Sequence, residues 1–294
     1  MTLLDQLAQY LASGLVVGGI YALIGLGFVI VFSVTRVINF AQGEFVTLGA
    51  LAMVTLGQWR LPTPLAFVTA VVAVAGVGAL LERAIHPIRG APPLAIFILT
   101  IGASIAIRGG ALIVWGTDPF ALAPFSAGPP LHVGGAIIVR QGLWVLAVAA
   151  LAFALLWVFF IRTYPGTAVR ACAINPRAAR LMGIRVDRMS LLAWMLSGAL
   201  GAGAGAVIAP ITYATYDMGL ILGLKGFVAA VLGGLVSPPA AIVGGFVLGI
   251  LESFAAGLVS SAYKDAVAFV ILIVFCLAQV AGWLPWRVAE EGTA

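Results

Sequence analysis

The chain has 294 residues, of which 63% are apolar on a count that leaves glycine out, and only 9% are charged, where about 25% is usual for soluble domains. So few polar side chains cannot cover a water-facing surface, which excludes a soluble globular enzyme, a disordered chain and a disulfide scaffold. The net charge of +5 is spread between apolar runs instead of forming one patch, so it favours orientation in a bilayer over nucleic-acid binding.

The apolar runs predict an all-α, polytopic transmembrane helical bundle. A spanning helix needs about 20 mostly apolar residues. A β-barrel is excluded because segments such as 143–160 are apolar on every face, without the alternation that barrel strands require. We predict about nine spans, near residues 10–34, 43–58, 64–82, 93–114, 141–161, 190–210, 219–236, 239–260 and 266–284. Three of them (43–58, 64–82 and 219–236) are short, which favours broken or tilted helices. Residues 1–294 are expected to form a single transmembrane domain.

Glycine pairs at GxxxG spacing occur in three of these runs. This spacing lets helix backbones approach closely, because dispersion packing drives helix association in lipid. It predicts a compact bundle without indicating a function. The pairs are Gly14 with Gly18, Gly201 with Gly205, and Gly245 with Gly249.

A polar break, residues 36–44, interrupts the first two runs. One interpretation is a helix start at the membrane edge, in which Asn39 caps a helix that begins at Phe40 and Gln42 occupies the N3 position of a capping box. The alternative is a re-entrant break that lines a translocation pathway, with Gln42 and Glu44 reachable from water. A helix N-terminus there would offer free N–H groups to a substrate carboxylate.

Ionisable residues inside the later spans are the other pathway candidates. Arg108 and Glu252 each fall beyond the middle of a span, on the outer side, and Asp217 and Lys225 lie in or near another span. Such groups are costly in lipid, so they pair with one another or face a cavity. A structural pair of arginine and carboxylate is favoured over a substrate site, which stays open.

The arginine distribution predicts the orientation. Six arginines against one aspartate lie in the loop 162–189, which identifies this loop as cytoplasmic. Nine alternating spans then place the N-terminus outside and the C-terminus inside. The Pro- and Gly-rich loop 115–140 faces outward, where it could meet a binding protein or act as a passive lid.

Within the cytoplasmic loop, capping signals predict a helix over 176–182. Asn175 is a good N-cap, Pro176 follows at the first helical position, and Gly183 supplies a stop. Helical spacing puts Ala179 and Met182 on one face. Arg177 and Arg180 share another. A helix of two turns is unstable alone in water, so it is either a connector held by the bundle or a docking element for a cytoplasmic protein.

Three stretches resemble the permease subunits of ABC importers for branched-chain amino acids, the LivH type. They are IYALIGLGFVIVFSVTRVINFAQGEFVTLGA, GTAVRACAINPRAARLMGIRVDRMSLLAWMLSGALGAGAGA and KGFVAAVLGGLVSPPAAIVGGFVLGILES. Their order and spacing agree with the family over about residues 10–280, and INFAQGE and NPRAARLMGI are its most specific motifs. The ribose-type sugar permeases share the fold but carry a different polar motif at INFAQGE. The C-terminal stretch AGWLPWRVAEEGTA departs from the family pattern.

The resemblance implies an inner-membrane subunit that forms half of the pathway for branched-chain or similar hydrophobic amino acids. It implies a second homologous permease, two cytoplasmic ATPase subunits and an extracytoplasmic substrate-binding protein as partners. The short helix would be the coupling helix, seated in a groove of the ATPase, with a small face at Ala179 leaving room for that groove. The family's coupling positions correspond to Asn175, Pro176, Arg177, Ala179, Arg180, Leu181 and Gly183.

No catalytic, cofactor or metal site is predicted for this chain. It has no GxxxxGK[ST] loop, so it cannot hold ATP in the P-loop manner, and ATP is expected to be used by the partner subunits. Two alternatives remain open: an ion-coupled secondary transporter of a small polar solute, and an ABC permease for urea, amides or other amino acids.

Overall fold

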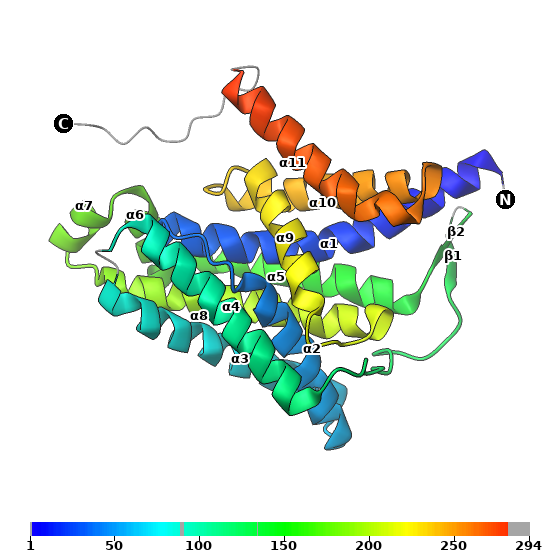
Figure 1. Ribbon diagram of the computed structural model, residues 1–294, viewed down its shortest axis with the longest axis horizontal. Helices are drawn as coiled ribbons and strands as arrows, with labels where there is room; N and C mark the ends of the chain where they lie inside the picture. Colours follow the sequence, from blue (N-terminus) through cyan, green and yellow to red (C-terminus); the bar gives the residue numbers. More distant parts are fainter. Residues whose placement is uncertain (1, 89–90, 134, 282–294) are drawn as a thin grey trace.

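The computed structural model describes residues 2–88, 91–133 and 135–281, which form a helical bundle with one short hairpin (Figure 1). The long helices are α1 (Leu3–Thr35), α2 (Gln42–Gln58), α3 (Thr63–Ile85), α4 (Pro93–Trp115), α5 (Arg140–Arg162), α8 (Val186–Thr212), α9 (Met218–Leu232), α10 (Pro238–Leu258) and α11 (Lys264–Val280). Shorter elements are the helices α6 (Tyr164–Ile174) and α7 (Pro176–Leu181), and 3-10 turns at His86–Ile88 and Ser261–Tyr263. Strands β1 (Leu131–Val133) and β2 (Ala136–Ile138) pair antiparallel, with His132 opposite Ile137.

Each of the nine predicted spans coincides with one long helix, which confirms the all-α bundle. Six of these helices are long and apolar enough to cross a membrane: α1, α3, α4, α5, α8 and α10. Helix α2, with 17 residues, is about 25 Å long at about 1.5 Å per residue, against a hydrocarbon core of about 30 Å. Helix α9 is shorter still, so nine is an approximate count of complete crossings. The end of the last predicted span and the C-terminal departure from the family pattern, residues 282–294, lie outside the described residues.

The two ends of the bundle carry different loops. The start of α1 lies beside the hairpin, where the Gln9 side chain accepts a hydrogen bond from Ile137 N (2.7 Å) and donates one to Ile137 O (3.2 Å). At the opposite end, α6 and α7 lie near the end of α1, where Arg36 Nη2 donates to Ala173 O (3.3 Å) (Figure 1). The start of α1 and the arginine-rich loop are therefore at opposite ends, as the predicted topology requires.

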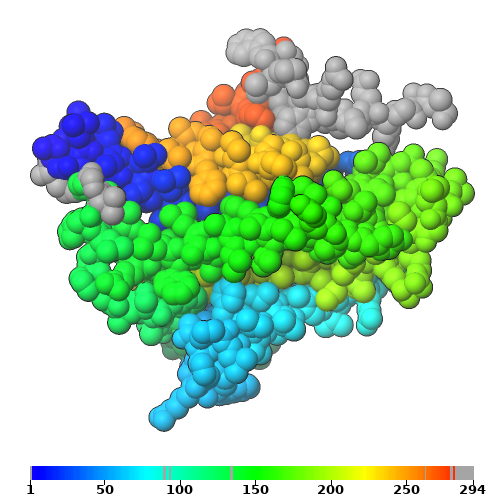
Figure 2. All heavy atoms as spheres, turned by 180° about the vertical axis from the view of Figure 1, so that it is seen from behind, coloured from blue at the N-terminus to red at the C-terminus, as the bar shows by residue number. Residues whose placement is uncertain are grey.

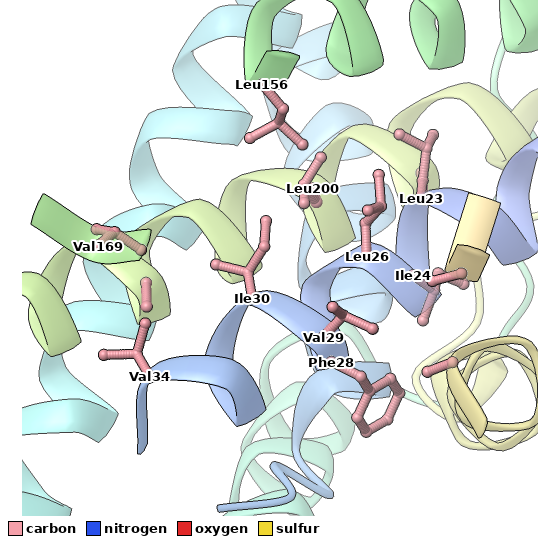
Figure 3. Packing of buried hydrophobic residues seen from close by; sticks show 14 of the residues in the cluster. Leu23, Ile24, Leu26, Phe28, Val29, Ile30, Val34, Leu156, Val169 and Leu200 are labelled. Carbon is pink, nitrogen blue, oxygen red and sulfur yellow. The ribbon is translucent and has the colours of Figure 1, made fainter. Parts of the chain in front are cut away.

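Helix α1 forms the centre of the bundle and is buried almost continuously from Gly18 to Val31. Its side chains pack against Leu156 of α5, Val169 of α6 and Leu200 of α8 (Figure 3). Because a helix that is apolar all round is expected in the interior of a membrane bundle, the burial agrees with the absence of a polar face in this segment.

Helix α5 crosses one face of the bundle, with the segment 164–185 beyond one of its ends and the hairpin beyond the other (Figure 2). Its outward side chains are apolar, and Leu151, Leu155 and Trp157 are each more than half exposed. Ile113 on α4 is also exposed. Lipid tails are as apolar as these side chains, so such a surface is stable in a membrane.

Glycine contacts set the closest helix packing. A Cβ atom built on Gly14 would lie 2.6 Å from the Ile250 backbone of α10, and one on Gly18 would lie 2.8 Å from the Phe246 backbone. Two of the predicted GxxxG pairs therefore face each other across the α1–α10 contact. The third pair, on α8, packs against α2 in the same way.

Candidate functional site

The break between α1 and α2 is an ordered turn held by hydrogen bonds. Helix α1 ends where Arg36 takes a left-handed conformation (φ 57°) and its N–H donates to Phe32 O (2.8 Å). Asn39 Oδ1 then accepts from Ala41 N (3.0 Å), and Asn39 O accepts from Gln42 N (3.1 Å). Asn39 is buried and folds a local turn of the Asx type, which holds the chain in position for α2.

The predicted capping box is wrong. Helix α2 begins at Gln42, not at Phe40, and Ala41 occupies the N-cap position without a side-chain cap. The Asn39 carboxamide bonds two residues ahead and so completes the turn that precedes the helix. The N–H groups of Gln42 and Glu44 are already bonded to backbone carbonyls, so these two are not free for a substrate carboxylate.

Gln42 joins α2 to α8. Its Nε2 donates to Ser197 O (3.2 Å), and the Ser197 hydroxyl donates to its Oε1. The side chain is fully buried in this contact. Gln42 therefore takes part in helix packing. Neither Gln42 nor Asn39 is among the described residues that line the cavity beside Glu44, which lies between α1, α2, α4 and α9.

Glu44, Ser104 and Arg108 form a charged cluster at the first turn of α2. Glu44 Oε1 accepts from Ser104 Oγ (2.8 Å), Arg108 Nη2 (3.1 Å) and Arg108 Nε (3.2 Å). Ser104 and Arg108 are one helical turn apart on α4, and Arg108 Nη2 also donates to Ser104 Oγ (3.3 Å). A carboxylate in the first turn of a helix is further stabilised by the helix dipole.

This cluster lines a cavity of about 220 Å³ between α1, α2, α4 and α9. Glu44 is 1% exposed, and within the described residues its Oε2 atom has no hydrogen-bond partner. Arg108 is 24% exposed on its side chain. The other lining residues are apolar: Phe28, Phe40, Gly43, Ile101, Ile105, Gly219, Leu220, Gly223, Leu224 and Phe227.

Close packing of α9 on α2 fixes the position of Glu44. A Cβ atom on Gly223 would lie 2.7 Å from the Gly43 backbone. Thr47 Oγ1, one turn after Gly43, accepts from Gly219 N (3.0 Å) at the start of α9. Gly43 on α2 and Gly219 and Gly223 on α9 leave no room for a side chain at this contact. The two helices can therefore approach only because these positions are glycine, and Glu44 lies next to the contact.

Phenylalanine rings lie between this cavity and a second one. The second cavity, about 490 Å³, lies beside the break and is lined by Phe97 together with Phe32, Thr35, Arg36, Val37, Ile38, Ala91, Leu94 and Ile96. The ring centroids of Phe40 and Phe97 are 4.9 Å apart, and those of Phe40 and Phe227 are 5.7 Å apart. Phe40 lines the first cavity and Phe97 the second, so their ring contact stands between them.

A second buried cluster joins α1, α9, α10 and α11. Lys225 Nζ lies 2.6 Å from Glu252 Oε1 and 2.6 Å from Asp265 Oδ1. The Tyr21 hydroxyl donates to Glu252 Oε2 (2.8 Å), and Lys225 Nζ lies 5.6 Å from the centre of the Tyr21 ring. Both oxygens of Glu252 therefore have partners, in contrast to those of Glu44.

Sequence reasoning found several of these residues but not their partners. The predicted arginine–carboxylate pair exists, and the carboxylate is Glu44. Glu252 pairs with Lys225. Asp217 lies exposed at the start of α9, outside the buried clusters. Ser104, Tyr21 and Asp265 were missed, although the four-residue spacing of Ser104 and Arg108 is a signal that places both on one face of a helix.

The cytoplasmic segment contains the predicted short helix. Helix α7 spans Pro176–Leu181, and Asn175 Oδ1 accepts from Arg177 N and Ala178 N, both at 3.0 Å. Gly183 ends it with φ 82°, and Ile184 N donates to Ala179 O (3.0 Å). The N-cap and the stop are both confirmed.

The predicted partner-facing surface at Ala179 is wrong. Ala179 is 4% exposed and packs into the core of the bundle, so this face of α7 is occupied by the chain itself. Leu181 is 89% exposed, and Met182 and Ile174 are similarly exposed. A helix this short is unstable alone, and the buried Ala179 is one of the contacts that hold α7 to the bundle.

Helix α6 precedes this segment and was not predicted. The Thr163 hydroxyl accepts from Gly166 N (3.1 Å) and caps its N-terminus. The signal in the sequence is Thr163 followed by a proline at the second helical position, Pro165. Two consecutive capped helices therefore form the described part of this loop.

The family model and the similar sequences agree with one another. A family model described as "Branched-chain amino acid transport system / permease component" matches residues 10–276. The high-affinity branched-chain amino acid transport system permease protein LivH of Escherichia coli K12 is 33% identical, with 94% of each chain covered. The corresponding protein BraD of Pseudomonas aeruginosa is 33% identical over 94% of this chain and 95% of its own length. Among solved structures, PsaBC from Streptococcus pneumoniae in complex with Fab matches with a TM-score of 0.49 and 15% identity, over 91% of this chain and 89% of that one.

Proposed function

The chain belongs to the family of branched-chain amino acid transport system permeases, and we propose that it forms half of the translocation pathway of an ATP-driven importer for branched-chain or similar hydrophobic amino acids. It is a multi-pass protein of the cell membrane and a transport subunit. The observation that carries the proposal is the family match over residues 10–276, which includes both the polar break and the capped helix α7.

ATP hydrolysis is assigned to separate subunits. Our proposed assembly contains a second homologous permease, two cytoplasmic ATPase subunits and an extracytoplasmic binding protein. The support from this chain is the absence of a P-loop motif in its sequence, together with a structured loop at the end of the bundle opposite the hairpin.

Helix α7 is the proposed contact with the ATPase. Asn175, Pro176 and Gly183 shape the helix, and Ala179 holds it to the bundle. The surface offered to a partner consists of two basic and two apolar side chains on an exposed turn: Arg177, Arg180, Leu181 and Met182. Exposed leucine and methionine side chains at the end of the bundle are the kind of anchor that a partner's groove covers.

Variants on the two sides of α7 test this contact. Leu181→Glu places a charge on the exposed face, so we expect normal protein level and loss of ATPase co-purification by at least about tenfold. Ala179→Glu puts a carboxylate into the core and should lower the protein level instead. Normal co-purification and uptake with Leu181→Glu would mean that α7 is only a connector.

Reconstitution tests the whole function. The chain is placed in proteoliposomes with a partner permease, the ATPase subunits and the binding protein, and uptake of radiolabelled leucine is measured with and without ATP. We expect uptake only with ATP and all subunits present. Uptake by the chain alone, driven by a proton gradient, would instead identify an ion-coupled secondary transporter. ATP-driven uptake of urea or an amide, without uptake of leucine, would change the substrate class.

A further inference from the structure

We propose that the cavity at Glu44, Ser104 and Arg108 is a binding site for the zwitterionic head group of an α-amino acid, with its ammonium on Glu44 and its carboxylate on Arg108. This inference rests on the proposed transport function and assigns a substrate contact to named residues within it. The aliphatic side chain of the ligand would lie against the phenylalanine and aliphatic walls of the same cavity.

The unequal use of the two Glu44 oxygens supports the ammonium position. Oε1 accepts all three hydrogen bonds from Ser104 and Arg108, whereas Oε2 is buried and accepts no hydrogen bond of ordinary geometry in the described part of the chain. Among the described residues, the Thr47 hydroxyl is the one other side-chain donor near this carboxyl, and it already accepts from Gly219 N. Leaving a carboxylate oxygen unsatisfied in a buried place is costly, and a buried carboxylate is normally fully hydrogen-bonded. An ammonium group of the ligand would supply the missing donor.

Arg108 has capacity for the ligand's carboxylate. A guanidinium carries five N–H donors in a planar fork, and the contacts to Glu44 and Ser104 use only Nε and Nη2. The Arg108 side chain is also partly exposed, while its partner Glu44 is not. Within the described residues the two N–H groups of Nη1 stay free, so the guanidinium can keep its bonds to Glu44 and Ser104 and still donate to a second carboxylate.

The size and walls of the cavity select a small ligand with an apolar side chain. A volume of about 220 Å³ is below the range of about 300–1,000 Å³ that is usual for drug-sized ligands. Apart from the charged cluster, its lining is phenylalanine, isoleucine, leucine and glycine. A charged end and an apolar end in one small space match a single hydrophobic amino acid better than a sugar, a metal ion or a peptide.

The Lys225 cluster is a buried ion pair of a different kind. Lys225 contacts two carboxylates, and Glu252 has partners on both oxygens. Lys225 and Glu252 are absent from the described lining of the Glu44 cavity. The unsatisfied oxygen and the adjoining space therefore distinguish Glu44 and Arg108 from a purely structural pair.

Photo-crosslinking tests the assignment on the assembled complex. The permease pair with its ATPase subunits is purified in nanodiscs and irradiated with a diazirine-bearing leucine analogue, and the labelled peptides are mapped by mass spectrometry. We expect labels on the parts of α4 and α9 that line the cavity. Leucine should compete, whereas leucinamide, which lacks the carboxylate, and isocaproate, which lacks the ammonium, should compete poorly.

Charge-neutralising variants provide the second arm. Glu44→Gln and Arg108→Gln should each reduce labelling at least about tenfold in complexes that retain their ATPase subunits, since each removes a hydrogen bond to a charged group. Arg108→Lys, which keeps the charge but loses the fork, should be intermediate. The matched control is Arg170→Gln, which neutralises an arginine lining a separate apolar cavity between α1, α5, α6 and α10, and should label as the unaltered complex does.

The outcomes separate the two proposals. Labelling that leucinamide and isocaproate compete as well as leucine does, or labelling undiminished in Arg108→Gln, would overturn the zwitterion site even if uptake is ATP-driven. The competition pattern is measured on the unaltered complex, so it decides the question even where a variant does not assemble. Absence of ATP-driven leucine uptake by the unaltered complex would instead refute the transport proposal.

Discussion

Each of the two charge clusters pairs a buried glutamate with a basic side chain, but the two glutamates are bonded differently. Around Lys225, four helices meet and each oxygen of Glu252 is bonded, to Lys225 or to Tyr21. Around Glu44, three hydrogen bonds converge on one oxygen, the other has no partner among the described residues, and a cavity adjoins the pair. Ionisable groups in a membrane protein are costly in both places. In the first cluster every carboxylate oxygen named above lies within 2.8 Å of a cation or a hydroxyl, whereas in the second an oxygen of Glu44 is left without such a contact among the described residues, beside a cavity.

The two clusters differ in whether both oxygens of the buried glutamate are hydrogen-bonded, not in whether they carry charge. We call a cluster closed when both oxygens of its buried glutamate are bonded within the protein, and open when one oxygen is not. The bonds of a closed cluster join helices, so removing them should lower stability. The free oxygen of an open cluster can bond a ligand, so removing the charge there should impair function. Substitutions that open the first cluster or close the second therefore test the distinction.

The largest effect is expected from Lys225→Met. This substitution leaves Glu252 buried without its cation and should lower the free energy of unfolding by about 3–5 kcal/mol. Unfolding in mixed detergent micelles measures it. The double variant Lys225→Met with Glu252→Gln removes the two buried charges and leaves only the partly exposed Asp265, so it should recover more than half of the loss. A single variant as stable as the unaltered chain would show that this cluster does not hold the helices together.

A smaller effect is expected from Tyr21→Phe. The change removes only the donor to Glu252 Oε2 and so makes Glu252 resemble Glu44, with one oxygen unpaired. We expect a loss of about 1 kcal/mol in the same unfolding measurement, with uptake per assembled complex unchanged. Altered uptake at full stability would contradict a packing role for this cluster.

The smallest effect on stability is expected from Ser104→Ala, about 0.5 kcal/mol, because Arg108 still bonds the same Glu44 oxygen. The concentration of the diazirine-bearing leucine analogue that gives half-maximal labelling should nevertheless rise, since Ser104 orients Glu44 in the cavity. A loss of stability as large as that of Lys225→Met would identify the Glu44 cluster as structural too.

The elements of this fold were predictable because they are local. Each long apolar run became a helix, and Asn175, Pro176 and Gly183 delimit α7 through bonds to residues close by in sequence. The side-chain pairs were not predictable in the same way. Glu44 and Arg108 are 64 residues apart, and no periodicity in one sequence indicates that the first turn of α2 meets the middle of α4.

Two errors have the same origin. Asn39 has several backbone N–H groups within reach, and the one it bonds depends on how α1 ends at Arg36. Ala179 is small and apolar, so its side chain suits an inward face and a partner-facing one equally well. Which face of α7 is covered depends on where the bundle lies, and this is a tertiary property.

A paired comparison of Glu44→Gln with Glu252→Gln tests the central claim most directly. Each variant neutralises one buried carboxylate, and the amount of assembled complex is measured together with ATP-driven leucine uptake per complex. We predict that Glu44→Gln assembles normally and loses uptake, whereas Glu252→Gln assembles poorly and transports normally in the complexes that form. Normal uptake by assembled Glu44→Gln, or loss of uptake by assembled Glu252→Gln, would contradict the distinction between an open and a closed cluster.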